Sequence, residues 1–334
     1  MTASANDPRK FFRGSVAISG GRISSVLPAT PDNGSDDRGT ESENRSRRVI
    51  DAGGKLLMPG LINLHNHVAM SLMRNYADDL PLMEWLADRV WPFEAKLTGD
   101  DVYLGARLGI AEMLLGGTTT FVDMYWHADR VAEAVLESGM RAVVCPAFID
   151  TNYEAFERET VRLVERYAGA DGGRLGVRIA PHAPYTCSPE SVRKALSLCE
   201  RYGLGIHVHL SETRSETETI RQRYDKTSAE YLRDLGVFDY PTLAVHCVHL
   251  TEEDMDILLR YGVSVAYNPQ SNMKLASGIA PVARMIGRGL TVGIGTDGPC
   301  SNNDLDMWDE MRTASLLQKV ATGDASVLPA YETL

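Results

Sequence analysis

Two histidines separated by one residue end an apolar run near the start of the chain. The stretch GLINLHNHVAM over residues 60–70 contains His65 and His67, with Asn66 between them. In an extended strand, the side chains of residues i and i+2 point to the same face. Imidazole nitrogens are common ligands of zinc and other first-row divalent metals. The spacing therefore predicts that both side chains bind one ion.

Other residues with metal-binding or acid–base chemistry follow later apolar runs. They are His182 in APHAPY, His209 and Glu212 in HVHLSE, His246 in AVHCVHL and Asp297 in GIGTDG. A scattered set of core histidines would not gather at the ends of strands. We therefore expect these side chains to meet His65 and His67 at one rim and to form a metal site.

Several other polar residues have a structural explanation beside a functional one. His207 shares a face with His209 but lies deeper, so we expect it to fill the interior. His249 should face away from His246 and be structural, and His127 should cap a helix or be solvated. Glu94 in WPFE is either a surface carboxylate or part of the site. Asp123 in FVDMY either faces the rim or pairs with an arginine.

Eight short apolar runs alternate with amphipathic segments of helical length. The runs are residues 57–65, 118–125, 141–150, 176–184, 205–212, 242–250, 263–271 and 290–298. This alternation predicts an α/β fold, a (β/α)8 TIM-type barrel, whose catalytic groups collect at the C-terminal ends of the strands. The alternative, a doubly wound sheet, more often has a glycine-rich turn after its first strand; this chain has His-Asn-His there.

The N-terminal part has a different composition from the barrel. Residues 11–27 predict a hairpin around Gly20-Gly21, and residues 28–48 predict a mobile polar loop. We expect residues 1–56 to form part of a small β-sandwich and residues 57–334 to form the barrel, truncated at its C-terminus. Residues 68–100 should form a loop and an extra helix over the barrel mouth.

Composition restricts the classes of partner and compartment. The net charge of −11 argues against nucleic-acid binding. The N-terminus does not resemble a signal peptide, and no apolar run is long enough to span a membrane. Five dispersed cysteines, including the expected small fillers Cys247 and Cys300, predict reduced thiols in the cytoplasm. The H-x-E and P-C-x-x-C motifs of His/Cys/Cys zinc deaminases are absent from the sequence.

Six motifs occur in an order that resembles the amidohydrolase superfamily. They are PGLINLHNH, PHAPYTCS, HVHLSE, HCVHL, NPQSNMKL and GTDGPCSNNDLDMWDEM, within residues 49–320. Within that superfamily they are most similar to the methylthioadenosine/S-adenosylhomocysteine deaminases. The resemblance implies a metal-dependent deaminase that converts an adenosine-type nucleoside to the inosine-type product and ammonia. The nucleoside would be methylthioadenosine, S-adenosylhomocysteine, 5′-deoxyadenosine or adenosine.

The resemblance also implies a role for each site residue. One divalent metal, usually zinc with iron or manganese as alternatives, would be held by His65, His67, His209 and Asp297. Glu212 would shuttle protons over the purine ring, and Asp297 would take a proton from water. His246 would orient the metal-bound water or stabilise the charge that develops. His182 would contact the substrate, and Glu94 would bind the ribose hydroxyls.

Two features leave alternatives open. Some relatives carry an arginine for the homocysteine carboxylate at the end of the third strand, where this chain has Cys145 and Pro146. Arg158 could take the place of that arginine. If it does not, methylthioadenosine, 5′-deoxyadenosine and adenosine, which lack the homocysteine carboxylate, are favoured as substrates. The alternative functions are a guanine- or triazine-type amidohydrolase and a non-catalytic truncated barrel. The sequence leaves open a homo-oligomer.

Overall fold

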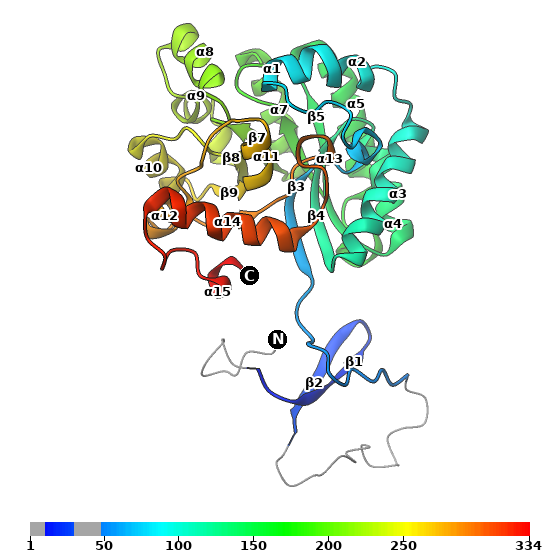
Figure 1. Ribbon diagram of the computed structural model, residues 1–334. Coiled ribbons are helices and arrows are strands. Elements are labelled where there is room, and N and C mark those ends of the chain that lie inside the picture. The colour runs from blue at the N-terminus through cyan, green and yellow to red at the C-terminus, as the bar shows by residue number, and fades with distance from the viewer. Residues whose placement is uncertain (1–10, 30–47) are drawn as a thin grey trace. The chain divides into compact units, whose positions relative to one another are not determined.

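The computed structural model describes residues 11–29 and 48–334, and the chain divides into two units, residues 1–60 and 61–334 (Figure 1). In the first unit, β1 (Gly14–Ser19) and β2 (Arg22–Pro28) pair antiparallel. Gly20 and Gly21 form their turn with φ of 58° and 73°, a backbone conformation that glycine adopts without strain. The predicted hairpin is confirmed. The predicted loop over residues 28–48 lies almost wholly outside the described residues, and residues 49–60 contain no strand.

The second unit contains eight parallel strands in chain order, which confirms the predicted fold class. The eight strands are β3 (Leu61–Asn66), β4 (Thr118–Tyr125), β5 (Arg141–Phe148), β6 (Leu175–Pro181), β7 (Gly205–Leu210), β8 (Thr242–His246), β9 (Ser264–Tyr267) and β10 (Val292–Ile294). Each strand pairs with the next one along the chain.

The first and last strands meet just beyond the end of β10. The backbone N–H of Asp297 donates to the carbonyl of His65 at 2.9 Å. The side chain of Asn63 bonds to Thr296 twice, donating to its hydroxyl at 2.7 Å and accepting from its N–H at 3.1 Å. These bonds bring the first and last strand ends together, and with them two of the predicted site residues.

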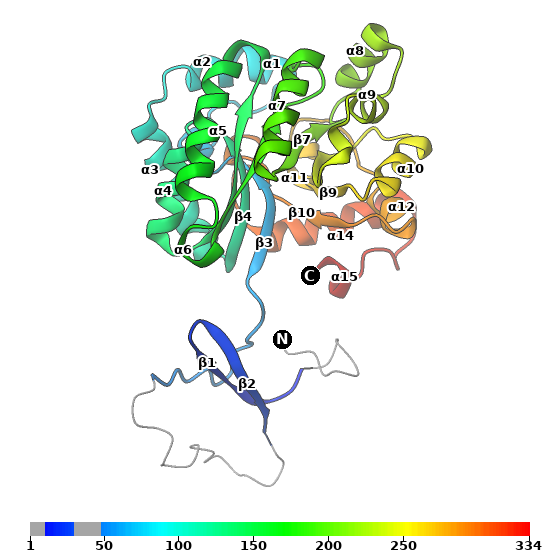
Figure 2. The same cartoon turned by 180° about the vertical axis from the view of Figure 1, so that it is seen from behind.

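Helices surround the sheet on its outer side (Figures 1 and 2). Those that follow β4 to β10 are α4 (Ala128–Ser138), α5 (Tyr153–Tyr167), α6 (Ala170–Gly173), α7 (Pro189–Tyr202), α8 (Arg214–Tyr224), α9 (Ser228–Asp234), α10 (Glu252–Arg260), α11 (Pro269–Lys274), α12 (Val282–Gly287), α13 (Pro299–Asn302), α14 (Met307–Thr322) and α15 (Ala330–Thr333). Two short 3-10 turns, η3 (Asp150–Asn152) and η4 (Val237–Asp239), precede α5 and β8. None of the described helices is long and apolar enough to cross a membrane.

The connection from β3 to β4 is the longest and contains several helical segments where one extra helix was expected. It contains η1 (Val68–Met73), α1 (Leu82–Glu84), the π-helical η2 (Trp85–Val90), α2 (Trp91–Glu94) and α3 (Gly99–Leu115). We call residues 82–94, the continuous helical run of α1, η2 and α2, the lid segment. Residues of this segment line the pocket described below.

Local signals explain where several helices begin and why the core forms. Ser188 caps α7 by accepting from the N–H of Ser191. Thr251 and Asp254 form a capping box at α10, as their spacing predicts.

One large cluster of buried apolar residues lies between the sheet and its helices. A smaller cluster contains residues that alternate along the strands, such as Val122 with Met124 and Leu243 with Val245. Alternation of this kind indicates the inner face of a barrel.

Candidate active site

Three of the predicted ligands converge where the first and last strands meet. Nε2 of His65 and Nε2 of His67 lie 3.2 and 3.1 Å from the same oxygen, Oδ1 of Asp297. The three side chains offer ligand atoms within 4.8 Å of one another. His65 and Asp297 are buried, and His67 is partly buried. Both imidazoles of the H-x-H motif therefore face one point, as their spacing predicts.

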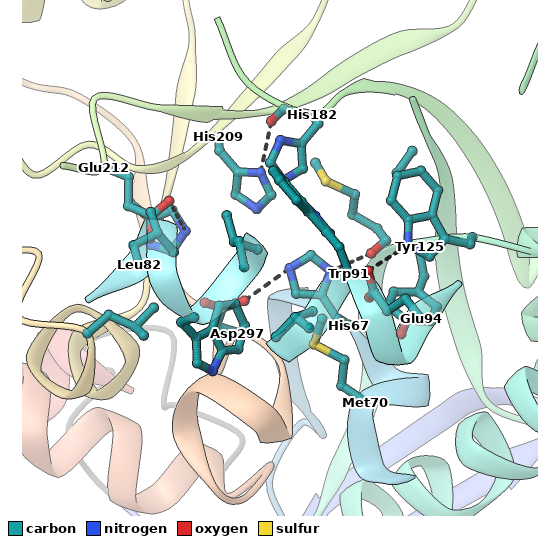
Figure 3. A pocket seen from close by; sticks show the side chains of 18 of the residues that line it. His67, Met70, Leu82, Trp91, Glu94, Tyr125, His182, His209, Glu212 and Asp297 are labelled. Atoms are coloured by element: carbon teal, nitrogen blue, oxygen red, sulfur yellow. Dashed lines mark hydrogen bonds and ion pairs between the residues drawn. The ribbon is translucent and has the colours of Figure 1, made fainter. Parts of the chain in front are cut away.

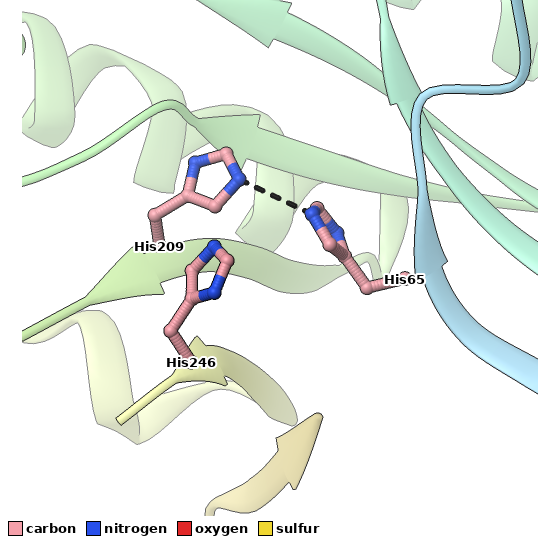
Figure 4. Close-up of side chains that lie close together, drawn as sticks. All are labelled: His65, His209 and His246. Carbon is pink, nitrogen blue, oxygen red and sulfur yellow. Dashed lines mark hydrogen bonds between the residues drawn. The ribbon is translucent and has the colours of Figure 1, made fainter. Parts of the chain in front are cut away.

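A second group of donor atoms shares His65 with the first. His65, His209 and His246 also offer atoms within 4.8 Å of one another. Nε2 of His209 lies 3.3 Å from Nε2 of His65 (Figure 4). The predicted set His65, His67, His209 and Asp297 is thus distributed over two overlapping groups. His246, predicted as a catalytic residue, lies among the donor atoms themselves.

Hydrogen bonds at Nδ1 orient the imidazoles. Nδ1 of His209 lies 2.8 Å from the carbonyl of His182, and Nδ1 of His67 contacts the carbonyl of Met124. A carbonyl only accepts, so Nδ1 must carry the proton in both rings. Nε2 of each ring therefore faces the centre, where it can bind a cation once it carries no proton. Ligating histidines are commonly oriented in this way.

The ionisation of these side chains suits a cation. Burial lowers the pKa of His65 to about 3 and that of His209 well below its ordinary value. Burial also opposes charge on His67, but the hydrogen bond and charge of Asp297 outweigh it and raise that pKa to about 9. The pKa of Asp297 lies well below its usual range because both histidines offset the cost of burial. The site therefore combines neutral imidazoles at His65 and His209 with an ion pair between protonated His67 and Asp297, whose proton a bound cation would displace.

Two site residues adopt backbone conformations that are uncommon for residues other than glycine. His246 has φ of 69° and Asp297 has φ of 61°. Residues held in the left-handed region cost free energy and occur often at functional sites. His246 ends β8, and Asp297 lies in the turn that follows β10, so the turn in the backbone aims their side chains across the barrel mouth.

Glu212 lies beside the histidines without joining their donor groups. It is 6% exposed, and its Oε2 lies 3.8 Å from Nε2 of His246. Burial raises the pKa of Glu212, although His246 partly opposes the shift. A buried carboxyl group with a raised pKa can hold a proton near neutral pH and donate it.

One cavity is lined by His67, His209, His246, Glu212 and Asp297 and extends under the lid segment, whereas His65 is buried and is not among its lining residues. Glu94 and Glu212 lie on opposite sides of the histidine and aspartate group in Figure 3. Glu94 is half-buried; burial raises its pKa, and the indole of Trp126 donates to its Oε2 at 3.0 Å. The remaining described residues that line the cavity are His182 and a mainly apolar set: Met70, Leu82, Trp85, Leu86, Val90, Trp91, Met124, Tyr125, Trp126, Ala147, Tyr185 and Leu275.

His182, the remaining predicted substrate contact, lies on the wall formed after β6. Burial lowers its pKa to about 4, so the imidazole is neutral. Its Nδ1 lies 3.1 Å from the hydroxyl of Thr186. The ring borders His209, with ring centroids 4.9 Å apart. His182 thus presents a neutral hydrogen-bonding ring to the cavity.

The structure decides between the alternatives for several other polar residues. Asp123 does not pair with an arginine: it is buried, accepts from the N–H of Val68 at 2.7 Å, and burial raises its pKa to about 7. His249 is structural and bonds to the carbonyl of Ser277. His127 is exposed at the start of α4, without a side-chain capping bond. Arg158 is exposed on α5 and is not among the residues that line the cavity, because its helix lies outside the sheet.

Sequence reasoning missed contacts behind the ligands. His207, expected only to fill the interior, places its Nε2 2.8 Å from Nδ1 of His65. From α11, Ser271 donates to Oδ2 of Asp297 at 2.6 Å, and Oδ1 of Asn272 lies 2.9 Å from Nδ1 of His246. The polar stretch NPQSN, residues 268–272 at the end of the seventh run, is the signal that could have identified the last two.

Comparison with known proteins gives consistent matches. The model of the amidohydrolase family matches residues 56–334. A 5-methylthioadenosine/S-adenosylhomocysteine deaminase from Desulforudis audaxviator is 52% identical over 96% of this chain and 73% of its own length. A protein of the same name from Pelotomaculum thermopropionicum is 49% identical over the same shares of the two chains.

Solved structures show the same fold. An adenosine deaminase from Xanthomonas campestris with bound zinc has a TM-score of 0.83 and 34% identity, over 96% of this chain and 72% of that one. A guanine deaminase from C. acetobutylicum with bound guanine has a TM-score of 0.85 at 23% identity, over 96% and 78% of the two chains. At that identity the second match supports the fold alone.

Proposed function

This chain belongs to the amidohydrolase family, and from that premise we propose that it is a metal-dependent hydrolytic deaminase of adenosine-type nucleosides. The overall reaction replaces the amine on C6 of the purine with oxygen: nucleoside and water give the inosine-type product and ammonia. The observation that carries this proposal is the buried carboxyl group of Glu212, with its raised pKa, beside a group of imidazoles and one carboxylate. A ring nitrogen needs such an acid to become protonated.

The donor set fits a divalent cation such as zinc. Nε2 of His65 and Nε2 of His209 face each other at 3.3 Å, and Nδ1 of His209 already donates to a carbonyl. Two lone pairs at this distance repel unless a proton or a cation lies between them. We assign His65, His67, His209 and Asp297 to the cation, with His246 adjacent. When bound, the cation supplies Lewis-acid activation of water, which provides a nucleophile at neutral pH.

Proton transfer is the task of the two carboxyl groups. Glu212 in its protonated form donates to N1 of the purine, which makes C6 electrophilic. Asp297 accepts the proton that the attacking water loses. Its Oδ2 is held by Ser271 while Oδ1 faces His65 and His67, so the carboxylate is fixed before substrate arrives. A proton delivered to the amine on C6 then allows ammonia to leave.

The rest of the nucleoside fits the apolar side of the cavity. Glu94 accepts hydrogen bonds from the ribose hydroxyls, and Trp126 orients its carboxylate. Among the described residues that line the cavity there is no lysine or arginine. An uncharged 5′ group, as in methylthioadenosine, 5′-deoxyadenosine or adenosine, therefore suits this cavity better than the amino-acid tail of S-adenosylhomocysteine.

A substrate panel tests the proposal. Zinc-loaded protein is incubated with methylthioadenosine, adenosine, S-adenosylhomocysteine and guanine, and ammonia release is measured beside the change in purine absorbance. We expect one equivalent of ammonia per nucleoside consumed, and faster turnover of the nucleosides with an uncharged 5′ group. Ammonia release from guanine alone, or chloride release from a chlorotriazine without any nucleoside turnover, would contradict the proposal.

A further inference from the structure

A buried carboxylate that the proposed reaction does not use lies directly behind Glu212. Glu216 is 3% exposed, in the first turn of α8. Its Oε1 accepts from the N–H of Ser211 at 2.8 Å and its Oε2 from the N–H of Glu212 at 2.9 Å. The hydroxyl of Ser228 donates to Oε1 at 2.8 Å. All three donors point to one carboxylate.

This arrangement differs from an ordinary helix cap. Thr213 caps α8 and accepts from the N–H of Glu216. In a capping box, the glutamate three residues on reaches back to the N–H of the capping residue itself. Here the carboxylate of Glu216 reaches past Thr213 to the two preceding N–H groups. Its contacts therefore fix the segment that carries Glu212 rather than the helix start alone.

The segment held by Glu216 lies beyond the support of the sheet. Strand β7 ends at Leu210, and Ser211 has φ of 50°, which is unusual for serine. The carbonyl of Ser211 accepts from the N–H of His249 at 2.9 Å, but among the described residues the two N–H groups bond only to Glu216. Without that carboxylate, a strained turn between His209 and Glu212 would have two buried donors unsatisfied.

We propose that Glu216 is a positioning residue for the proposed reaction: its carboxylate clamps the backbone of Ser211 and Glu212 and so aims the carboxyl group of Glu212 at the purine. This inference rests on the proposed role of Glu212. It assigns no contact with substrate or metal to Glu216. The clamp acts through the backbone, so its loss should displace Glu212 while the imidazoles on β3 and β7 stay in place.

Glu216→Gln is the sharpest single change. Whichever way the amide is turned, its NH2 group meets the N–H of Ser211 or of Glu212, so a donor faces a donor. A displacement of about 1 Å at a reacting group can cost about 10²-fold in rate. We expect kcat to fall by about 10²-fold with KM changed by less than about threefold, and metal content to remain as in the wild type.

Asp254→Asn is the matched control. Asp254 is 1% exposed, occupies the corresponding position in α10, and accepts from the N–H of Thr251 and the hydroxyl of Thr227. It holds no residue of the site. We expect this variant to be destabilised to a similar degree, with kcat within about twofold of the wild type. A general loss of folding would instead affect both variants equally.

A double-mutant cycle separates positioning from structure. In a Glu212→Gln background, Glu216→Gln should lower kcat by less than about twofold, because the group that it positions has already been removed. A full effect of Glu216→Gln in that background, or kcat near the wild-type value in the single variant, would overturn the clamp. If Glu212→Gln itself left kcat unchanged, the proposed function would be the part that fails.

Backbone hydrogen exchange tests the clamp without any turnover. Peptides that contain residues 211 and 212 should exchange faster in Glu216→Gln and at the wild-type rate in Asp254→Asn. Unchanged protection in Glu216→Gln would overturn the proposal even if activity fell. Ser228→Ala removes one of the three hydrogen bonds to Glu216 and provides a milder variant if Glu216→Gln gives too little folded protein. The exchange rate of residues 211 and 212 in Ser228→Ala should lie between the wild-type rate and that of Glu216→Gln.

Discussion

The two halves of the candidate active site are held in place by different means. The imidazoles of His65 and His209 lie on strands, and backbone ladders with neighbouring strands hold them. Glu212 and Glu94 lie beyond strand ends, on a loop and on the lid segment. The carboxylate of Glu216 holds Glu212 by accepting from its N–H, and the indole of Trp126 holds Glu94 by donating to its carboxylate. Under the proposed function, the ligands His65 and His209 depend on the barrel strands themselves, whereas the groups proposed to act on the substrate depend on the connections.

The largest effect should follow from removing a strand-borne ligand. His65→Ala or His209→Ala leaves too few donors for the cation, so we expect loss of stoichiometric metal and a fall in kcat/KM of about 10⁴-fold or more, equivalent to about 5.5 kcal/mol in the barrier. Metal analysis of the purified variants checks this. His127→Asn, at an exposed position outside the site, should keep both metal and activity.

Removing the acid on the loop should separate chemistry from metal binding. Glu212→Gln cannot donate its proton to the ring, so kcat should fall by about 10²–10⁴-fold while metal content stays at the wild-type level. Steady-state kinetics with metal analysis measures both quantities. Glu218→Gln, at an exposed position of the same helix α8, is the control. Loss of metal in Glu212→Gln would show that Glu212 contributes to metal binding and would contradict its separate role as the acid.

A change in the lid segment should affect binding more than turnover. A hydrogen bond to a charged group contributes about 1.5–3 kcal/mol, so Glu94→Gln should raise KM for a ribonucleoside by about 10–100-fold, with kcat changed much less. The same variant should show little change with a 2′,3′-dideoxynucleoside, which lacks the hydroxyls. An equal loss for both substrates would mean that Glu94 does not bind ribose.

The smallest effect concerns the stability of the fold, at a residue outside both halves of the candidate active site. Burial and the neighbouring Asp129 raise the pKa of Glu159 to about 7, against backbone hydrogen bonds from Ala128 and Asp129 that lower it. Between pH 4.5 and 7 the folded state keeps a proton that the unfolded state loses, so this stability is present at low pH and is lost as pH rises through 7.

Denaturant titrations at pH 5 and pH 8 measure this loss. From pH 5 to pH 8, the wild type should lose about 1–2 kcal/mol of unfolding free energy relative to Glu159→Gln. Glu157→Gln, at an exposed position of the same helix, controls for removal of a charge. If the unfolding free energies of the wild type and of Glu159→Gln changed equally with pH, the raised pKa of Glu159 would be contradicted.

The strand-borne half could be predicted because its information is local. Apolar runs mark the strands, and a histidine at the end of a run or two residues on must face the mouth, as His65 and His67 do. The bonds of Glu216 to Ser211 and Glu212 could not be predicted. They depend on how a helix start is placed against a strand end, which no periodicity records. Asp123 shows the same limit, since its partner is a backbone N–H from another connection.

The bond between the N–H of Asp297 and the carbonyl of His65 joins residues 232 positions apart in the chain. During synthesis, therefore, the histidines of the first strand leave the ribosome long before their carboxylate partner exists. A nascent chain that ends short of residue 297 has imidazoles but no complete coordination shell. Tight capture of a cation should thus coincide with the arrival of the last of the eight strands.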